Sequence, residues 1–217
     1  MDWERLGAYG GSLALQWALM CGTLGALDWV AGALGASAAL GSGEKFAVGL
    51  FFTALALRSR LFARLPAPRP RKGSYGTIEE VVRPSWTPPR LVFPIVWSTI
   101  AVLRGTSSAM VWAATGERLL CWPLAVFCLH LCFGDVWNFV NNVENDRGVA
   151  VPGVFLCLLS ASATVYFYYR ALPAAGLVLL PLPVWLCVAS ALVTTIYSLN
   201  GGGPMYPALA PDADEAA

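Results

Sequence analysis

Four long apolar runs fill the second half of the chain and limit what it can fold into. They cover residues 91–114, 119–141, 149–170 and 175–199. A helix needs about 20 apolar residues to cross hydrocarbon about 30 Å thick, and each run meets that length. Because the loops between the runs are short, consecutive helices must lie antiparallel. The sequence therefore predicts an all-α, polytopic transmembrane helix bundle, in keeping with a hydrophobic content of 57%, a charged content of 12% and a mean hydropathy of +0.61.

The first half of the chain is less regular. Residues 12–40 are long and apolar enough to span a membrane, whereas the apolar stretch within residues 45–64 is shorter and ends at Arg58 and Arg60. This second segment spans only if those arginines snorkel to the interface. The sequence GSGEK at 41–45 predicts a tight turn between the two segments. We expect five spanning helices and a sixth over residues 45–64.

Basic residues concentrate in the loop between Arg58 and Arg90, which holds most of the chain's 14 Lys and Arg residues. By the positive-inside rule, that loop and the acidic tail face the cytosol or its equivalent.

We divide the chain into an N-terminal transmembrane helix or hairpin with the basic loop (1–74), a transmembrane core (75–200) and a polar tail (201–217). The lipid bilayer is the first partner of this multi-pass integral membrane protein, and no nucleic acid partner is expected. Its membrane, bacterial or that of a mitochondrion, a plastid or the endomembrane system, stays open.

The six cysteines all fall within apolar runs and show no CxxC spacing, and the chain has a single histidine. A structural zinc site needs four Cys or His ligands at short, regular spacings. We therefore expect no metal site and interpret the cysteines as small buried hydrophobic residues. They are Cys21, Cys121, Cys128, Cys132, Cys157 and Cys187.

Four ionisable residues lie within the apolar segments, where charge is costly and often functional: Asp28, Arg104, His130 and Asp135. Counting along antiparallel helices from the turn near residues 116–118 places Arg104 and His130 at one level, each about 18 Å from that turn. Asp135 lies about a turn and a half farther along. Two interpretations stay open. Either Arg104 and Asp135 neutralise each other or snorkel, or Arg104, His130 and Asp135 form a polar floor for a bound ligand.

Three tryptophans differ from the aromatic residues that line most membrane interfaces. Trp97, Trp137 and Trp185 each fall inside a span or at its mouth, on the same side of the membrane. Converging aromatic faces form a flat apolar slot that suits a planar ligand. The residues therefore predict an aromatic binding slot inside the bundle.

A proline-rich segment, RPSWTPPRLVFPIVW at residues 83–97, leads into the first of the four runs. Pro88 and Pro89 fix the backbone before the helix starts, where their missing N–H groups matter least. The segment therefore predicts a rigid strap that holds Trp86 near the membrane surface. We expect Trp86, Pro88 and Pro89 to form the rim of the slot.

This strap and its helix resemble the second-helix signature of the TspO/translocator protein family, also called peripheral benzodiazepine receptors or tryptophan-rich sensory proteins. Three further stretches agree in order and spacing: LHLCFGDVW resembles the third helix, LLPLPVW the entry to the fifth and ALVTTIYSLN its end. The resemblance covers residues 76–200 and identifies a divergent member with an extra N-terminal helix. The matching signature residues of the second helix are Pro84, Trp86, Pro88, Pro89, Phe93, Trp97, Gly105, Val111 and Trp112.

The resemblance implies a five-helix transmembrane bundle, commonly a homodimer, that binds porphyrins, sterols and synthetic aromatic ligands under the loop before the second helix. The ligand it implies here is a tetrapyrrole, such as haem, protoporphyrin or a chlorophyll-type pigment, or a sterol. Porphyrin degradation, proposed for some relatives, is not carried over. The positions that match the family's pocket are Phe93, Pro94, Trp97, Trp137, Trp185, Ala189 and Leu192.

The chain departs from the family pattern mainly at polar positions. Gly134 and Val193 stand where asparagines are usual, His130 replaces a glutamine and Arg104 replaces a methionine. Three positions that hold a tyrosine or a tryptophan in the family pattern also differ. The chain thus keeps the aromatic residues that the family pattern has in the walls of its pocket, whereas the polar pocket residues differ. The changed aromatic positions are Ala101, Leu182 and Tyr197.

Three functions stay open. The first is a membrane receptor or carrier that binds a planar lipophile for transport or sensing. The second is a structural or assembly subunit of a larger membrane complex, respiratory or photosynthetic, that retains the fold without the ligand. The third is an enzyme acting on a bound porphyrin with His130 as axial ligand or proton donor. The sequence shows no nucleotide loop, hydrolytic triad or usable carboxylate pair, so the common enzyme classes find no support.

Overall fold

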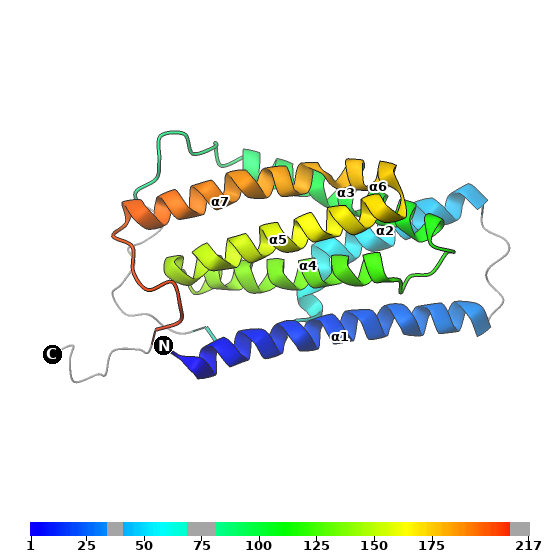
Figure 1. Cartoon of the computed structure of the whole chain (residues 1–217), viewed down its shortest axis with the longest axis horizontal. Coiled ribbons are helices and arrows are strands. Elements are labelled where there is room, and N and C mark those ends of the chain that lie inside the picture. Colours follow the sequence, from blue (N-terminus) through cyan, green and yellow to red (C-terminus); the bar gives the residue numbers. More distant parts are fainter. Residues whose placement is uncertain (34–40, 69–80, 209–217) are drawn as a thin grey trace.

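The computed structural model describes residues 1–33, 41–68 and 81–208, and within these ranges the regular structure is entirely helical. Figure 1 shows the long helices lying side by side with nearly parallel axes. The prediction of an all-α transmembrane bundle is confirmed. The helices are α1 (Trp3–Ala33), α2 (Gly41–Arg58), α3 (Val92–Ala114), α4 (Trp122–Asn138), α5 (Arg147–Ala171), α6 (Pro173–Leu179) and α7 (Pro181–Leu199). A 3₁₀ turn, η2 (Ser59–Phe62), follows α2, and a π turn, η3 (Phe139–Val143), follows α4.

Four helical segments are long and apolar enough to cross a membrane: Trp3–Ala33, Trp122–Val143, Arg147–Ala171 and Pro173–Leu199. Helix α3 has 23 residues and is thus about 34 Å long, but its polar residues lower its hydropathy. It still belongs to the bundle, because α2, α5 and α6 pack along it.

Helices α2 and α3 approach closely at Gly105. A Cβ atom at Gly105 would collide with Thr53 Oγ1 and lie 2.5 Å from the Gly49 carbonyl oxygen. Gly49 itself leaves room for the methyl group of Ala109, 3.8 Å from where a Cβ atom would be. Small residues thus let the two backbones touch, as in other membrane helix pairs.

The prediction of a turn at GSGEK is wrong, because residues 41–45 already form the start of α2. Glu44 lies in the first turn, where a negative charge favours a helix N-terminus. The connection from α1 falls in residues 34–40, outside the described residues. Helix α1 also begins earlier than expected, at Trp3 instead of residue 12.

The last span is broken near its start. The expected loop before residue 175 is already helical from Pro173, and the break comes at Leu180, between α6 and α7. Pro181 lies in the first turn of α7, where proline starts a helix and cannot continue the preceding one. The sharp turn into α6 places Gly176 against the Tyr169 backbone, where a Cβ atom would lie 2.7 Å from Tyr169 N.

Helix α1 lies along α4 (Figure 1) and is tied to the core by polar contacts. Trp17 Nε1 donates to the Ala125 carbonyl at 2.8 Å. The Asp28 carboxylate accepts hydrogen bonds from the Leu119 N–H at 2.7 Å and the Leu120 N–H at 2.8 Å. Asp28, one of the four ionisable residues within the apolar segments, therefore anchors the loop before α4.

The cysteines are mostly but not all buried. Cys128, Cys132 and Cys157 are buried, and Cys21 and Cys121 are partly buried. Cys187 is exposed, so the expectation fails at this position. It lies on the outward face of α7, next to the exposed Val184 and Val188, where the surrounding lipid is the apolar partner.

Candidate functional site

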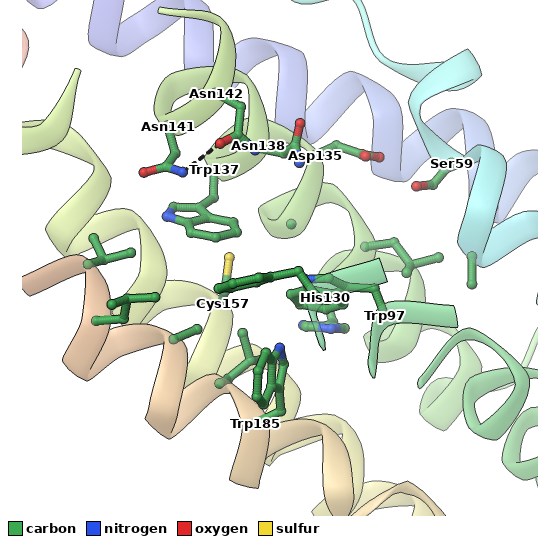
Figure 2. A pocket seen from close by; sticks show the side chains of 18 of the residues that line it. Ser59, Trp97, His130, Asp135, Trp137, Asn138, Asn141, Asn142, Cys157 and Trp185 are labelled. Carbon is green, nitrogen blue, oxygen red and sulfur yellow. Dashed lines mark hydrogen bonds between the residues drawn. The ribbon is translucent and has the colours of Figure 1, made fainter. Parts of the chain in front are cut away.

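A cavity of about 580 Å³ lies among α3, α4, α5 and α7 and is bounded on one side by the end of α2. Nine of the predicted site residues line it, although they come from three different helices, α3, α4 and α7 (Figure 2). Its size is typical of a small-molecule site. The nine residues are Phe93, Trp97, Arg104, His130, Asp135, Trp137, Trp185, Ala189 and Leu192.

Aromatic rings form the walls. The Phe93 and Trp185 rings pack edge to face, with centroids 6.0 Å apart. Trp137 Nε1 donates to the Ala150 carbonyl at 3.2 Å, and Gly153 allows the indole to lie close against α5. In Figure 2, Trp137 and Trp185 lie on opposite sides of the cavity. The slot expected from the three tryptophans is thus present as a space.

A chain of hydrogen bonds crosses the floor. Arg104 Nη2 lies 2.9 Å from His130 Nε2, as the level count along α3 and α4 predicts. His130 Nδ1 lies 3.0 Å from Ser160 Oγ, and the Ser160 hydroxyl donates to the Cys157 carbonyl at 3.0 Å. The Arg104 guanidinium also lies 5.8 Å from the centroid of the Trp97 ring, within cation–π range. The floor is therefore polar, buried and held by α3, α4 and α5 together.

Asp135 has partners of its own. Gln16 Nε2, from α1, donates to Asp135 Oδ2 at 2.7 Å and to the Ser59 carbonyl at 3.0 Å. Figure 2 shows the Ser59 side chain on the same side of the cavity as Asp135. Among the described residues, Arg104 makes no salt bridge with Asp135. Direct neutralisation of Arg104 by Asp135 is thus not what the structure shows.

The mouth of the cavity is basic and amide-rich. Arg83, from the strap, and Arg147, at the start of α5, line it together with Asn138, Asn141 and Asn142. Sequence reasoning missed these residues because they lie in loops or at helix ends, where apolar periodicity carries no signal. The adjacent asparagines at the end of an apolar run were the one available hint.

Four predicted residues do not line the cavity. Pro94 is exposed, because Phe93 faces inward and the next helical residue points about 100° away. Trp86 is 48% exposed and, with Pro88 and Pro89, lies outside the lining. From the strap, Arg83 reaches the mouth instead of the expected rim residues.

Comparison with known proteins points to one family. The profile of the TspO/MBR family matches residues 47–198, more than half of the chain. Protein CrtK of Rhodobacter capsulatus is 30% identical over 57% of this chain and 78% of its own length. The tryptophan-rich sensory protein of Cereibacter sphaeroides is 26% identical over 56% of this chain and 75% of its own length. The human translocator protein is 28% identical over 55% of this chain and 72% of its own length.

The match begins inside α2, so the matched part contains α2, α3, α4, α5 and the broken α6–α7 segment, and α1 precedes it. The all-helical fold and the sequence match agree. The chain belongs to the TspO/MBR family and is an integral, multi-pass membrane protein.

Proposed function

We propose that this protein binds a planar lipophilic ligand, a tetrapyrrole or a sterol, in the cavity among α3, α4, α5 and α7, for transport or sensing. The observation that carries the proposal is the set of three indoles, Trp97, Trp137 and Trp185, that line one cavity from three different helices. A flat ring system placed there would bury apolar area against aromatic faces on more than one side. The names of two relatives, a sensory protein and a translocator protein, fit this proposal.

The test is a ligand titration of the purified protein. Haem, protoporphyrin or chlorophyllide is added while tryptophan fluorescence and ligand absorbance are followed. We expect saturable quenching that weakens in Trp97→Ala and in Trp137→Ala. The matched control is Trp29→Ala, because Trp29 lies on α1, 75% exposed and outside the cavity lining. Non-saturable quenching, or isotherms that the two cavity variants leave unchanged, would refute the proposal.

A second candidate is a subunit that assembles into a larger membrane complex. Helix α1 motivates it, because this helix precedes the family match and leaves Trp3, Leu27 and Trp29 exposed to lipid or to a neighbouring subunit. In that case blue-native electrophoresis of native membranes should show the protein only at high mass. Migration as a free monomer or homodimer would contradict an assembly role and leave ligand binding as the better account.

A further inference from the structure

Arg104 is a cation inside the bundle without an anionic partner among the described residues. It lies 12 residues from Val92, about 18 Å along α3. Its guanidinium contacts the His130 imidazole and the Trp97 ring, neither of which carries a negative charge. An arginine stays charged in proteins, and a buried charge without a counterion is strongly unfavourable. Such a residue in a membrane span usually serves a ligand or a transported ion.

His130 cannot compensate for this charge, because its neighbours set its tautomer. The Ser160 hydroxyl donates its proton to the Cys157 carbonyl, so Ser160 Oγ must accept from His130 Nδ1–H. His130 Nε2 is then unprotonated and accepts from Arg104 Nη2. Both ring nitrogens are used, so axial ligation of a metal or proton donation by His130 would first break one of these bonds.

Arg104 lines the cavity, and only one of its guanidinium nitrogens, Nη2, contacts another described side chain through a hydrogen bond. Its Nε is buried and has no hydrogen-bond partner among the residues that the structure describes. Asp135, the one carboxylate among the lining residues that the structure describes, receives a bond from Gln16 instead. Arg83, Arg104 and Arg147 together with this one carboxylate give the described part of the lining a net positive charge. The geometry therefore favours an anionic occupant.

We propose that the occupant of the cavity is a lipophilic acid whose ionised carboxylate binds Arg104 at the floor while its planar body lies among the three tryptophans. This inference rests on the proposed function and narrows it to acids. A carboxylate is the natural partner because its two oxygens accept from the parallel N–H groups of a guanidinium. A neutral planar lipophile contacts the same rings but leaves Arg104 Nε unpaired.

The experiment compares an acid with its neutral ester. Pyropheophorbide a, a tetrapyrrole with one carboxylate, and its methyl ester are each titrated into the detergent-purified protein and followed by tryptophan quenching. We expect the acid to bind about 10- to 100-fold more tightly, the ratio that corresponds to one charged hydrogen-bonded pair. In Arg104→Met the ratio should fall to near one, and in Arg104→Lys it should stay above one. Because micelle partitioning of the two compounds is the same for every variant, it cancels when the ratios are compared.

The arginines at the mouth provide the control. If the carboxylate binds at the floor, the acid–ester ratio persists in the double variant Arg83→Gln/Arg147→Gln, and this result does not require any Arg104 variant to fold. A ratio that disappears in the double variant, or persists in Arg104→Met, would overturn the floor assignment. Equal binding of acid and ester to the unaltered protein would overturn the inference and leave the proposed function intact. The absence of saturable binding by either compound would overturn both.

Discussion

Asn200, at the end of α7, hydrogen-bonds the backbone of Val82, the residue directly before the strap. Asn200 Oδ1 accepts a hydrogen bond from the Val82 N–H at 3.1 Å, and Asn200 Nδ2 donates to the Val82 carbonyl at 2.9 Å. Arg83 follows directly and lines the mouth of the cavity. We therefore predict that Asn200→Ala releases the strap and the arginine it carries, while the bundle stays folded.

The size of the effect follows from the two bonds. Each neutral hydrogen bond contributes about 1 kcal/mol net, so their loss lowers the free energy of opening the strap by about 2 kcal/mol. That difference raises the open population about 30-fold. Hydrogen exchange followed by mass spectrometry or NMR should show a similar acceleration at the Val82 N–H, whose protection depends on Asn200.

Two controls make the experiment specific. The Thr87 N–H is bonded within the strap to the Pro84 carbonyl at 3.0 Å and should retain most of its protection. Ser198→Ala removes a hydroxyl at the same end of α7 that, among the described residues, bonds to the Thr194 carbonyl of its own helix, and it should leave the exchange of the Val82 N–H unchanged. If Asn200→Ala and the unaltered protein exchange Val82 at the same rate, the strap is held by something other than this side chain, and the reasoning is wrong.

Two further predictions concern the packing that frames the cavity, and both are read from thermal or denaturant unfolding in detergent. Gly105→Ala should destabilise the protein by about 1–3 kcal/mol, because its methyl group collides with α2, whereas Gly22→Ala, with nothing within 4 Å, should have no such effect. Equal stability of the two variants would contradict the close α2–α3 approach. Gln16→Leu should lower the free energy of unfolding by about 1–3 kcal/mol, because Asp135 loses its hydrogen-bond donor. Adding Asp135→Leu should restore most of that free energy. A double variant as unstable as the single one would show that the bond contributes little.

The bundle and the walls of its cavity could be predicted from the sequence. Apolar runs of spanning length predict the long helices, and counting residues from a turn places Arg104 opposite His130. Trp97, Trp137 and Trp185 could be placed on one side of the membrane for the same reason. These features depend on helix geometry alone, which the sequence expresses directly.

The mouth and the α1 contacts could not be predicted in this way. Arg83 reaches the cavity because Asn200 holds the preceding residue, and that contact joins residues 118 positions apart. Gln16 reaches Asp135 because α1 packs along α4, a choice that no local pattern encodes. The start of α2 at Gly41 was misread because two glycines next to charged residues resemble a turn, although Glu44 also suits a helix N-terminus.

The polar contacts of α1 bear on where the protein can be divided. The family match starts inside α2, yet three groups beyond that point take their partners from α1: Glu144 pairs with Arg5, Asp135 accepts from Gln16, and the N–H groups before α4 donate to Asp28. A chain shortened to the matched segment would leave the carboxylates of Glu144 and Asp135 and the N–H groups of Leu119 and Leu120 without these bonds. We therefore expect the matched segment alone to be less stable than a chain that includes α1.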